Sequence, residues 1–158
     1  MSSTHKVRQN ARALFTRHLR LLAAGRVREW VELFDEDGAL ELAFCPPGIP
    51  WRYAGHRDLH EYPRYIRQHA KARFSPPTFH ATEDPELVIA EYHSRGVAVT
   101  TRRAFTQTYL SVAYIRKSRI TLLRDFWNPL VVLDAFGGPE ARDYVLGAPA
   151  ESRERRAA

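Results

Sequence analysis

The sequence predicts a cone-shaped α+β fold, in which three N-terminal helices pack on a strongly curved antiparallel sheet. The first observation is a change of periodicity: apolar residues recur at helical spacing up to about residue 72 and alternate from about residue 74. The second is the density of β-branched and aromatic residues between positions 86 and 127. A chain of 158 residues is most simply one domain. We assign residues 1–146 to that domain and 147–158 to a disordered tail.

Composition narrows the class of protein. The chain is 44% hydrophobic and 27% charged, as in ordinary globular proteins. It shows neither a membrane-length apolar run nor a signal-type N-terminus, so we expect a cytoplasmic protein without a membrane partner. Cys45 is alone, which excludes an internal disulfide framework. The net charge is +6, but the arginines are scattered, so we expect a solvated basic surface and no nucleic-acid partner.

Three segments have the spacing of amphipathic helices. The longest covers residues 4–24; hydroxyl residues at positions 2–4 offer N-caps, and Gly25 ends the helix. Phe15 and His18 fall on its apolar stripe. A second, short helix is predicted from Val27 to the acidic turn at residues 35–38. The third is predicted over residues 58–72, where Pro63 either begins or kinks the helix.

The strands are expected between turn-forming residues. Proline and glycine make residues 45–50 a rigid loop, and Pro76-Pro77 makes its strand irregular or peripheral. The long β-rich stretch should break at 95–96 or at 101–103, and 116–119 should form a hairpin tip. A short helix is predicted over 139–146. The predicted strand segments are 39–44, 74–82, 86–95, 97–115 and 120–127.

The last strand carries the most informative residue, Asp125, directly before Phe126 and Trp127. Asn128-Pro129 then breaks the ladder, because proline has no N–H and restricts the residue before it. An acid among aromatic residues indicates a carboxylate at the mouth or floor of a pocket. The alternative is a structural ion pair with Arg124 or another arginine.

This pattern of strand, acid, aromatic pair, Asn-Pro-Leu and short apolar tail resembles the last strand of the nuclear transport factor 2-like superfamily. Within it, the sequence is most similar to SnoaL-like polyketide cyclases and phenazine biosynthesis A/B proteins, over about the first 137 residues in element order. The resemblance implies the cone fold. It also implies that Asp125 matches the acid/base carboxylate of the cyclases, while Tyr109 and Ser111 replace their glutamine and histidine.

The same superfamily contains the ketosteroid isomerases, which differ from this chain at two positions. His18 corresponds to a pocket-facing tyrosine of their first helix. Leu42 or Phe44 stands where they carry a catalytic aspartate, so the same isomerisation is not expected.

These residues suggest a cofactor-independent acid–base enzyme. Burial beside aromatic rings disfavours the charged form of Asp125, which raises the pKa toward the range in which a carboxyl group both accepts and donates a proton. That chemistry suits a cyclase, isomerase or dehydratase acting on a small hydrophobic natural-product intermediate in an apolar pocket. We predict Asp125, His18 and Tyr109 as catalytic residues. The predicted substrate-binding residues are Phe15, Trp51, Tyr53, Tyr65, Glu91, His93, Gln107, Ser111 and Trp127.

Other possibilities stay open from the sequence. One is a non-catalytic small-molecule binding protein, favoured if Asp125 pairs with Arg124, Arg102 or Arg103. The chain would suit an interaction module if the core is filled. His56 and His60 are four residues apart but lack a third metal ligand at motif spacing, so no metal and no cofactor are expected. Apolar residues on both faces of the 107–115 segment predict a homodimer through the outer sheet face.

Overall fold

The computed structural model describes residues 3–46 and 49–137. The predicted helix 139–146 and the predicted tail 147–158 lie outside the described residues. The helices are α1 (Ser3–Ala24), α2 (Val27–Val31), α3 (Gly55–Leu59), α4 (Glu61–His69), α5 (Pro129–Val132) and the π-helix η1 (Leu133–Gly137). The strands are β1 (Phe34–Leu42), β2 (Arg52–Ala54), β3 (Ala70–Phe74), β4 (Thr78–Phe79), β5 (Leu87–Ala98), β6 (Ala104–Arg116) and β7 (Arg119–Trp127).

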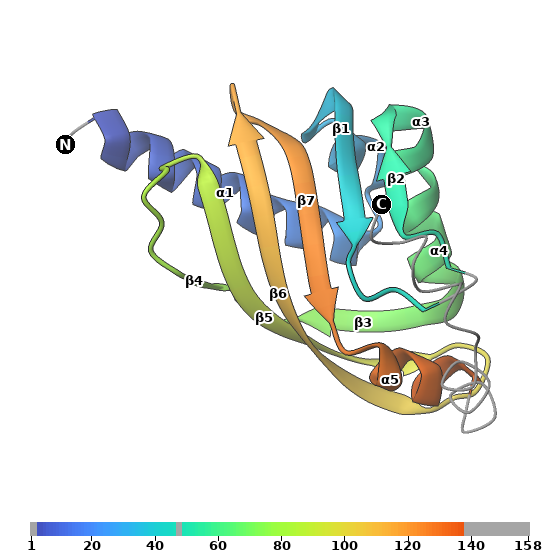
Figure 1. Ribbon diagram of the computed structural model, residues 1–158. Coiled ribbons are helices and arrows are strands. Elements are labelled where there is room, and N and C mark those ends of the chain that lie inside the picture. The colour runs from blue at the N-terminus through green and yellow to red at the C-terminus, as the bar shows by residue number, and fades with distance from the viewer. Residues whose placement is uncertain (1–2, 47–48, 138–158) are drawn as a thin grey trace, which may run out of the picture.

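The strands form one curled sheet in the order β2-β1-β7-β6-β5-β3, with β4 paired to β5. Helix α1 crosses one face of this sheet, and α3 and α4 stand beside β2 (Figure 1). At the other end, β5 and β6 bend toward β3 and α5 (Figure 1). The predicted cone-shaped α+β fold is therefore confirmed. One pairing differs from the antiparallel prediction: β1 and β7 are parallel.

The early elements differ from the sequence prediction at their boundaries. The acidic residues 35–38 do not end a helix but belong to β1, where the pairing with β7 shifts register between Phe34 and Ala39. The predicted third helix consists of two helices, because the helical structure is interrupted at His60. The second of them ends at His69. Residues 70–74 are already a strand, and their pairing with β5 overrides the helical spacing of this segment.

The two long hairpins follow the prediction closely. The break in the β-rich stretch falls at 99–103, which selects the second of the two predicted positions. At the β6–β7 connection, only Lys117 and Ser118 lie between the strands, and both have positive φ, 50° and 61°. Two left-handed residues are what a tight turn needs to match the twist of the flanking strands. The hairpin thus sets the β6–β7 register and places Ser111 directly opposite Asp125.

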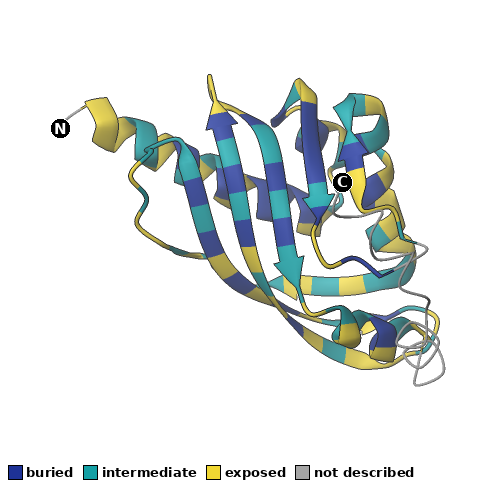
Figure 2. Cartoon of the chain, viewed as in Figure 1, coloured by how far each residue is buried: buried dark blue, intermediate teal, exposed yellow. Residues whose placement is uncertain are grey.

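The core lies between α1 and the concave face of the sheet (Figure 2). Alternation along β6 buries Gln107, Ser111 and Ala113, whereas Leu110 on the other face is 40% exposed. Within the described part of the chain, no helix is long and apolar enough to cross a membrane.

Candidate active site

The concave face of the sheet is organised in rows set by strand register. One row joins Ala90 of β5, Ser111 of β6, Asp125 of β7 and Leu42 of β1. The next row toward the open end of the cone joins Tyr92, Tyr109 and Trp127. Leu123, Asp125 and Trp127 therefore share this face of the sheet.

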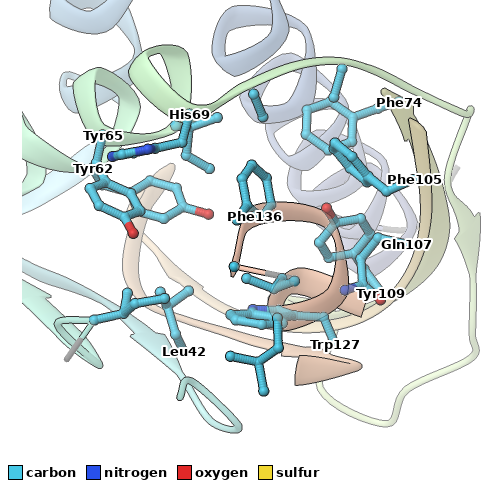
Figure 3. Close-up of a pocket in the computed structure, with 17 residues that line it drawn as sticks. Leu42, Tyr62, Tyr65, His69, Phe74, Phe105, Gln107, Tyr109, Trp127 and Phe136 are labelled. Carbon is cyan, nitrogen blue, oxygen red and sulfur yellow. The ribbon is translucent and has the colours of Figure 1, made fainter. Parts of the chain in front are cut away.

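An apolar cavity of about 200 Å³ opens from this second row toward the wide end. Tyr62, Tyr65 and His69 of α4 lie on one side of it, and Gln107 and Tyr109 of β6 lie on the other (Figure 3). None of the lining residues is an aspartate, glutamate, lysine or arginine. The lining consists of Leu42, Ile49, Tyr62, Tyr65, Ile66, His69, Ala70, Ala72, Phe74, Phe105, Gln107, Tyr109, Trp127, Val132, Leu133, Phe136 and Gly137. Such an apolar lining with few polar groups is typical of small-molecule sites.

Asp125 is not among the residues that line the cavity and is only 4% exposed. Its Oδ1 accepts a 2.5 Å hydrogen bond from the Ser111 hydroxyl, whose oxygen lies 2.9 Å from the hydroxyl of Tyr92. Arg124 points to the other face and pairs with Glu41 at 2.7 Å. The ion pairs of the described residues do not include Asp125, so the predicted alternative of a structural ion pair with Arg124 is wrong.

The second carboxylate oxygen of Asp125 stays open to a ligand. Among the fully buried side-chain nitrogen and oxygen atoms of the described residues, only His18 Nε2 lacks a hydrogen-bond partner. The Oδ2 atom of Asp125 makes no hydrogen bond there. Because Oδ2 is absent from these fully buried atoms, it keeps a small exposed area, although Asp125 is not among the residues that line the cavity.

Burial sets the protonation behaviour of the site. Desolvation raises the pKa of Asp125 from 3.8 to about 6, against a smaller lowering by the Ser111 hydrogen bond. Burial likewise raises the pKa of Tyr109 to about 12, opposed by its hydrogen bond with Ser94 and helped by the charge of Asp125. Near neutral pH the carboxyl group can thus take or give a proton, while the phenol stays protonated.

Gln107 lines the cavity, but its amide is committed to the backbone. Its Nε2 donates to the carbonyl of Asn128 at 2.8 Å, and its Oε1 accepts from the N–H groups of Asn128 and Thr108, both at 3.1 Å. Asn128 then caps α5 by accepting from Leu130 N–H. Gln107 therefore joins β6 to the end of β7 and fixes the start of α5, the element that carries Val132 to the cavity.

His18 is buried in the core and does not line the cavity. Its Nδ1 lies 2.8 Å from Trp30 Nε1. The indole nitrogen can only donate, so Nδ1 is the acceptor and the proton of the neutral ring is on Nε2. Burial lowers the pKa of His18 to about 3, which keeps the ring neutral. Nε2–H is thus a buried donor without a partner in the described residues.

The remaining predicted residues divide between cavity, core and surface. Tyr65 and Trp127 line the cavity together with Gln107 and Tyr109, while Ser111 stands beside Asp125. Phe15 and Tyr53 are buried in the core. These two and the last three residues lie outside the cavity lining, which corrects the prediction that they contact a substrate there: Trp51, Glu91 and His93.

Strand pairing explains two of these corrections. Tyr92 pairs with Tyr109, so Tyr92 takes the concave face, and its neighbours Glu91 and His93 take the convex one. Glu91 instead contacts His80 at 3.0 Å on the surface. Trp51 is 40% exposed and lies against Arg124 and Phe126 on the outside of the sheet.

Several cavity residues were absent from the predicted site. Tyr62, Ile66 and His69 belong to one helical stripe of α4, and that stripe was visible in the sequence as the face of the third helix. Nothing in the sequence indicated that this face lines a cavity and not a filled core. Phe105 and Phe136 come together only through the fold, with ring centroids 5.6 Å apart.

The two histidines considered for a metal have other surroundings. Nε2 of His56 lies 3.0 Å from the carbonyl oxygen of Phe34. Among the described residues, no three histidine, cysteine, aspartate or glutamate side chains are grouped as metal ligands would be.

A cone of helices on a curled sheet is the fold of the nuclear transport factor 2-like class. The sequence is 41% identical over 137 residues, 87% of this chain and 97% of the relative, to an uncharacterized PhzA/B-like protein of Pseudomonas aeruginosa. The chain therefore belongs to the PhzA/B-like, SnoaL-like family of that superfamily.

Solved structures agree with this placement. A candidate isomerase of Bacillus subtilis is similar with a TM-score of 0.76 and 32% identity, covering 82% of this chain and 94% of that one. A phenazine biosynthesis-related protein of Pseudomonas aeruginosa gives a TM-score of 0.72 at 19% identity, with 86% and 90% covered, and shows the fold alone. No protein-family model matches the sequence.

Proposed function

We propose that this protein is a cofactor-independent acid–base enzyme of the cyclase, isomerase or dehydratase kind. Its substrate is a small hydrophobic natural-product intermediate that fills the apolar cavity, and Asp125 transfers the proton. The observation that carries the proposal is the state of Asp125: buried, without an ion pair in the described residues, and with one oxygen free of hydrogen bonds.

The physical reason is that a carboxyl group of this kind is costly to keep and suited to proton transfer. An ionised carboxylate in an apolar environment is destabilised unless it is paired, so a structural role would favour a partner such as arginine. A pKa near 6 instead places the group where it exchanges protons at neutral pH. A relative named as a candidate isomerase supports the same kind of chemistry.

The residues around Asp125 take supporting roles in this proposal. Ser111 holds one carboxylate oxygen, Tyr92 holds the Ser111 hydroxyl, and the other carboxylate oxygen is left to accept the proton. Tyr109 and Trp127 line the cavity in the row next to that of Asp125. His18, held by Trp30, is buried in the core and has no contact with the cavity, so it takes no direct part.

A small-molecule binding protein is the second candidate, because Asp125 is not among the residues that line the cavity. Proton exchange separates the two functions. 2-Tetralone, a small bicyclic ketone with acidic C–H bonds beside its carbonyl, is incubated in D₂O, and deuterium uptake is followed by NMR. An enzyme of the proposed kind accelerates uptake above the buffer rate; a binding protein leaves the uptake rate of the bound ketone at or below it.

We also propose a homodimer through the convex face of β5–β7. Phe44, Ile89, Leu110 and Phe126 line an open, shallow hollow there, and Leu110 is 40% exposed. Two-fold pairing of such a face is the commonest way to bury it.

Light scattering tests this dimer. The protein is expected to have about twice its chain mass of 18.2 kDa at micromolar concentration. Leu110→Lys, which places a charge in the hollow, should give the mass of one chain. Leu130→Lys, at a similarly exposed position on α5, should leave the mass unchanged. A wild-type mass near 18 kDa would rule the dimer out.

A further inference from the structure

Tyr62 is a cavity residue whose hydroxyl has no assigned partner. It lies on the inward face of α4 and is only 7% exposed. Its ring is held between Trp30, at a centroid distance of 5.9 Å, and Tyr53, at 5.3 Å. The hydroxyl makes no hydrogen bond to the described residues. The phenol is therefore fixed in position, and its polar end faces the cavity.

Buried Tyr53 likewise makes no hydrogen bond through its hydroxyl in the described residues, but it does not line the cavity; two other neighbouring tyrosines have partners. The hydroxyl of Tyr92 is 2.9 Å from Ser111, and that of Tyr109 is 3.0 Å from Ser94. Tyr65, which also lines the cavity, is 36% exposed and reaches water. Buried hydroxyl groups are nearly always hydrogen-bonded, because an unpaired one costs free energy. The contents of the cavity are what remains to pair with Tyr62.

Tyr62 also faces the proton-transfer residue. After burial, the charge of Asp125 is the largest of the influences that raise the pKa of Tyr62, so the two groups lie within electrostatic reach of each other. Tyr62 stands on α4 and Asp125 on β7. A phenol with a raised pKa stays protonated and acts as a hydrogen-bond donor.

We infer that Tyr62 donates a hydrogen bond to a carbonyl oxygen of the substrate while Asp125 takes a proton from the adjacent carbon. This assignment rests on the proposed function and narrows the substrate to small, uncharged carbonyl compounds. The C–H electron pair forms the new C=C bond, and the carbonyl π pair moves to the oxygen, which Tyr62 stabilises as an enolate. Protonated Asp125 then returns its proton to a carbon or oxygen of the intermediate.

The lining of the cavity is the reason for an uncharged substrate. No aspartate, glutamate, lysine or arginine is among the residues that line it. A carboxylate or ammonium group placed there would lose its hydration without a counter-ion. A carbonyl oxygen needs only a donor, and donors aimed at a developing negative charge give the largest electrostatic contributions to catalysis.

Two probes with one carbon skeleton test the inference by calorimetry: 2-tetralone, which has the carbonyl oxygen, and tetralin, which does not. We expect wild-type protein to bind the ketone more tightly, by roughly twofold to tenfold, the range of one neutral hydrogen bond. Tyr62→Phe keeps the ring packing and should abolish the preference. Tyr114→Phe removes a hydroxyl from the opposite face of the sheet and should keep it. Tyr62→Phe should also slow deuterium uptake by on the order of 10²–10³.

Equal binding of the ketone and the hydrocarbon by the wild-type protein, or binding of neither, would overturn the assignment. An unchanged binding preference and an unchanged uptake rate in Tyr62→Phe would also overturn it. The failure of the proposed function looks different. If the proposed function is wrong, 2-tetralone takes up deuterium at the same rate with Asp125→Asn as with the wild-type protein. The preference for binding the ketone over the hydrocarbon still reports on Tyr62 alone.

Discussion

Asp125→Asn is expected to slow deuterium uptake into 2-tetralone by on the order of 10²–10⁴, the usual contribution of general acid–base catalysis. Asparagine keeps the shape of the side chain and an oxygen that accepts from Ser111, but it cannot take a proton. Ligand affinity should therefore change little. The rate is measured per folded molecule, with melting temperature recorded for the same samples.

The control for this prediction is Arg124→Gln. Arg124 is the neighbour of Asp125 in sequence, but its side chain lies on the opposite face and pairs with Glu41. Its removal should leave the uptake rate near that of the wild type. A folded Asp125→Asn variant with full activity would refute the catalytic assignment and favour the binding-protein function.

Stability is expected to depend on pH through the same residue. The pKa of Asp125 is about 6 in the folded protein against an ordinary value of 3.8, so between these values the folded state holds the proton more tightly than the unfolded chain. The stabilisation is present below pH 3.8 and is lost as the pH rises through about 6. The difference corresponds to about 3 kcal/mol at about 1.4 kcal/mol per pH unit.

The groups that face Asp125 do not alter this direction. Tyr62 of α4, Tyr92 of β5 and Tyr109 of β6 all have raised pKa values and stay neutral over this range. Asp125→Asn removes the titration, so the variant should match wild-type stability near pH 4 and exceed it by up to about 3 kcal/mol at pH 8. Urea unfolding at both pH values measures this. A variant less stable than wild type at pH 8 would indicate a hidden stabilising partner of the carboxylate.

Much of the fold was predictable because it depends on local pattern. The apolar stripe of α1 and the alternation of β6 and β7 are each specified within one element. The turn at Lys117 and Ser118 then fixes the register that brings Ser111 to Asp125. Asp125 was therefore identified from the sequence with its correct face.

The errors arise where a partner distant in the sequence decides. Alternation along β5 places Glu91 and His93 on one face of the strand and Tyr92 on the other. Only the pairing with β6 determines which of the two faces is turned toward the cavity. The acidic residues 35–38 became part of a strand through the irregular parallel pairing of β1 with β7, across about 80 residues of chain. The sequence places Tyr62 on the apolar face of a helix but does not mark it as a site residue, because a filled core and a cavity give the same periodicity.

The central claim is that Asp125 is an unpaired buried carboxyl group that titrates close to neutral pH. It is tested most directly by ¹³C NMR titration of its carboxyl carbon, assigned by comparison with Asp125→Asn. The account predicts a midpoint near pH 6. A midpoint at or below the ordinary value of 3.8 would show that the carboxylate is stabilised by a partner, and would contradict the proton-transfer role.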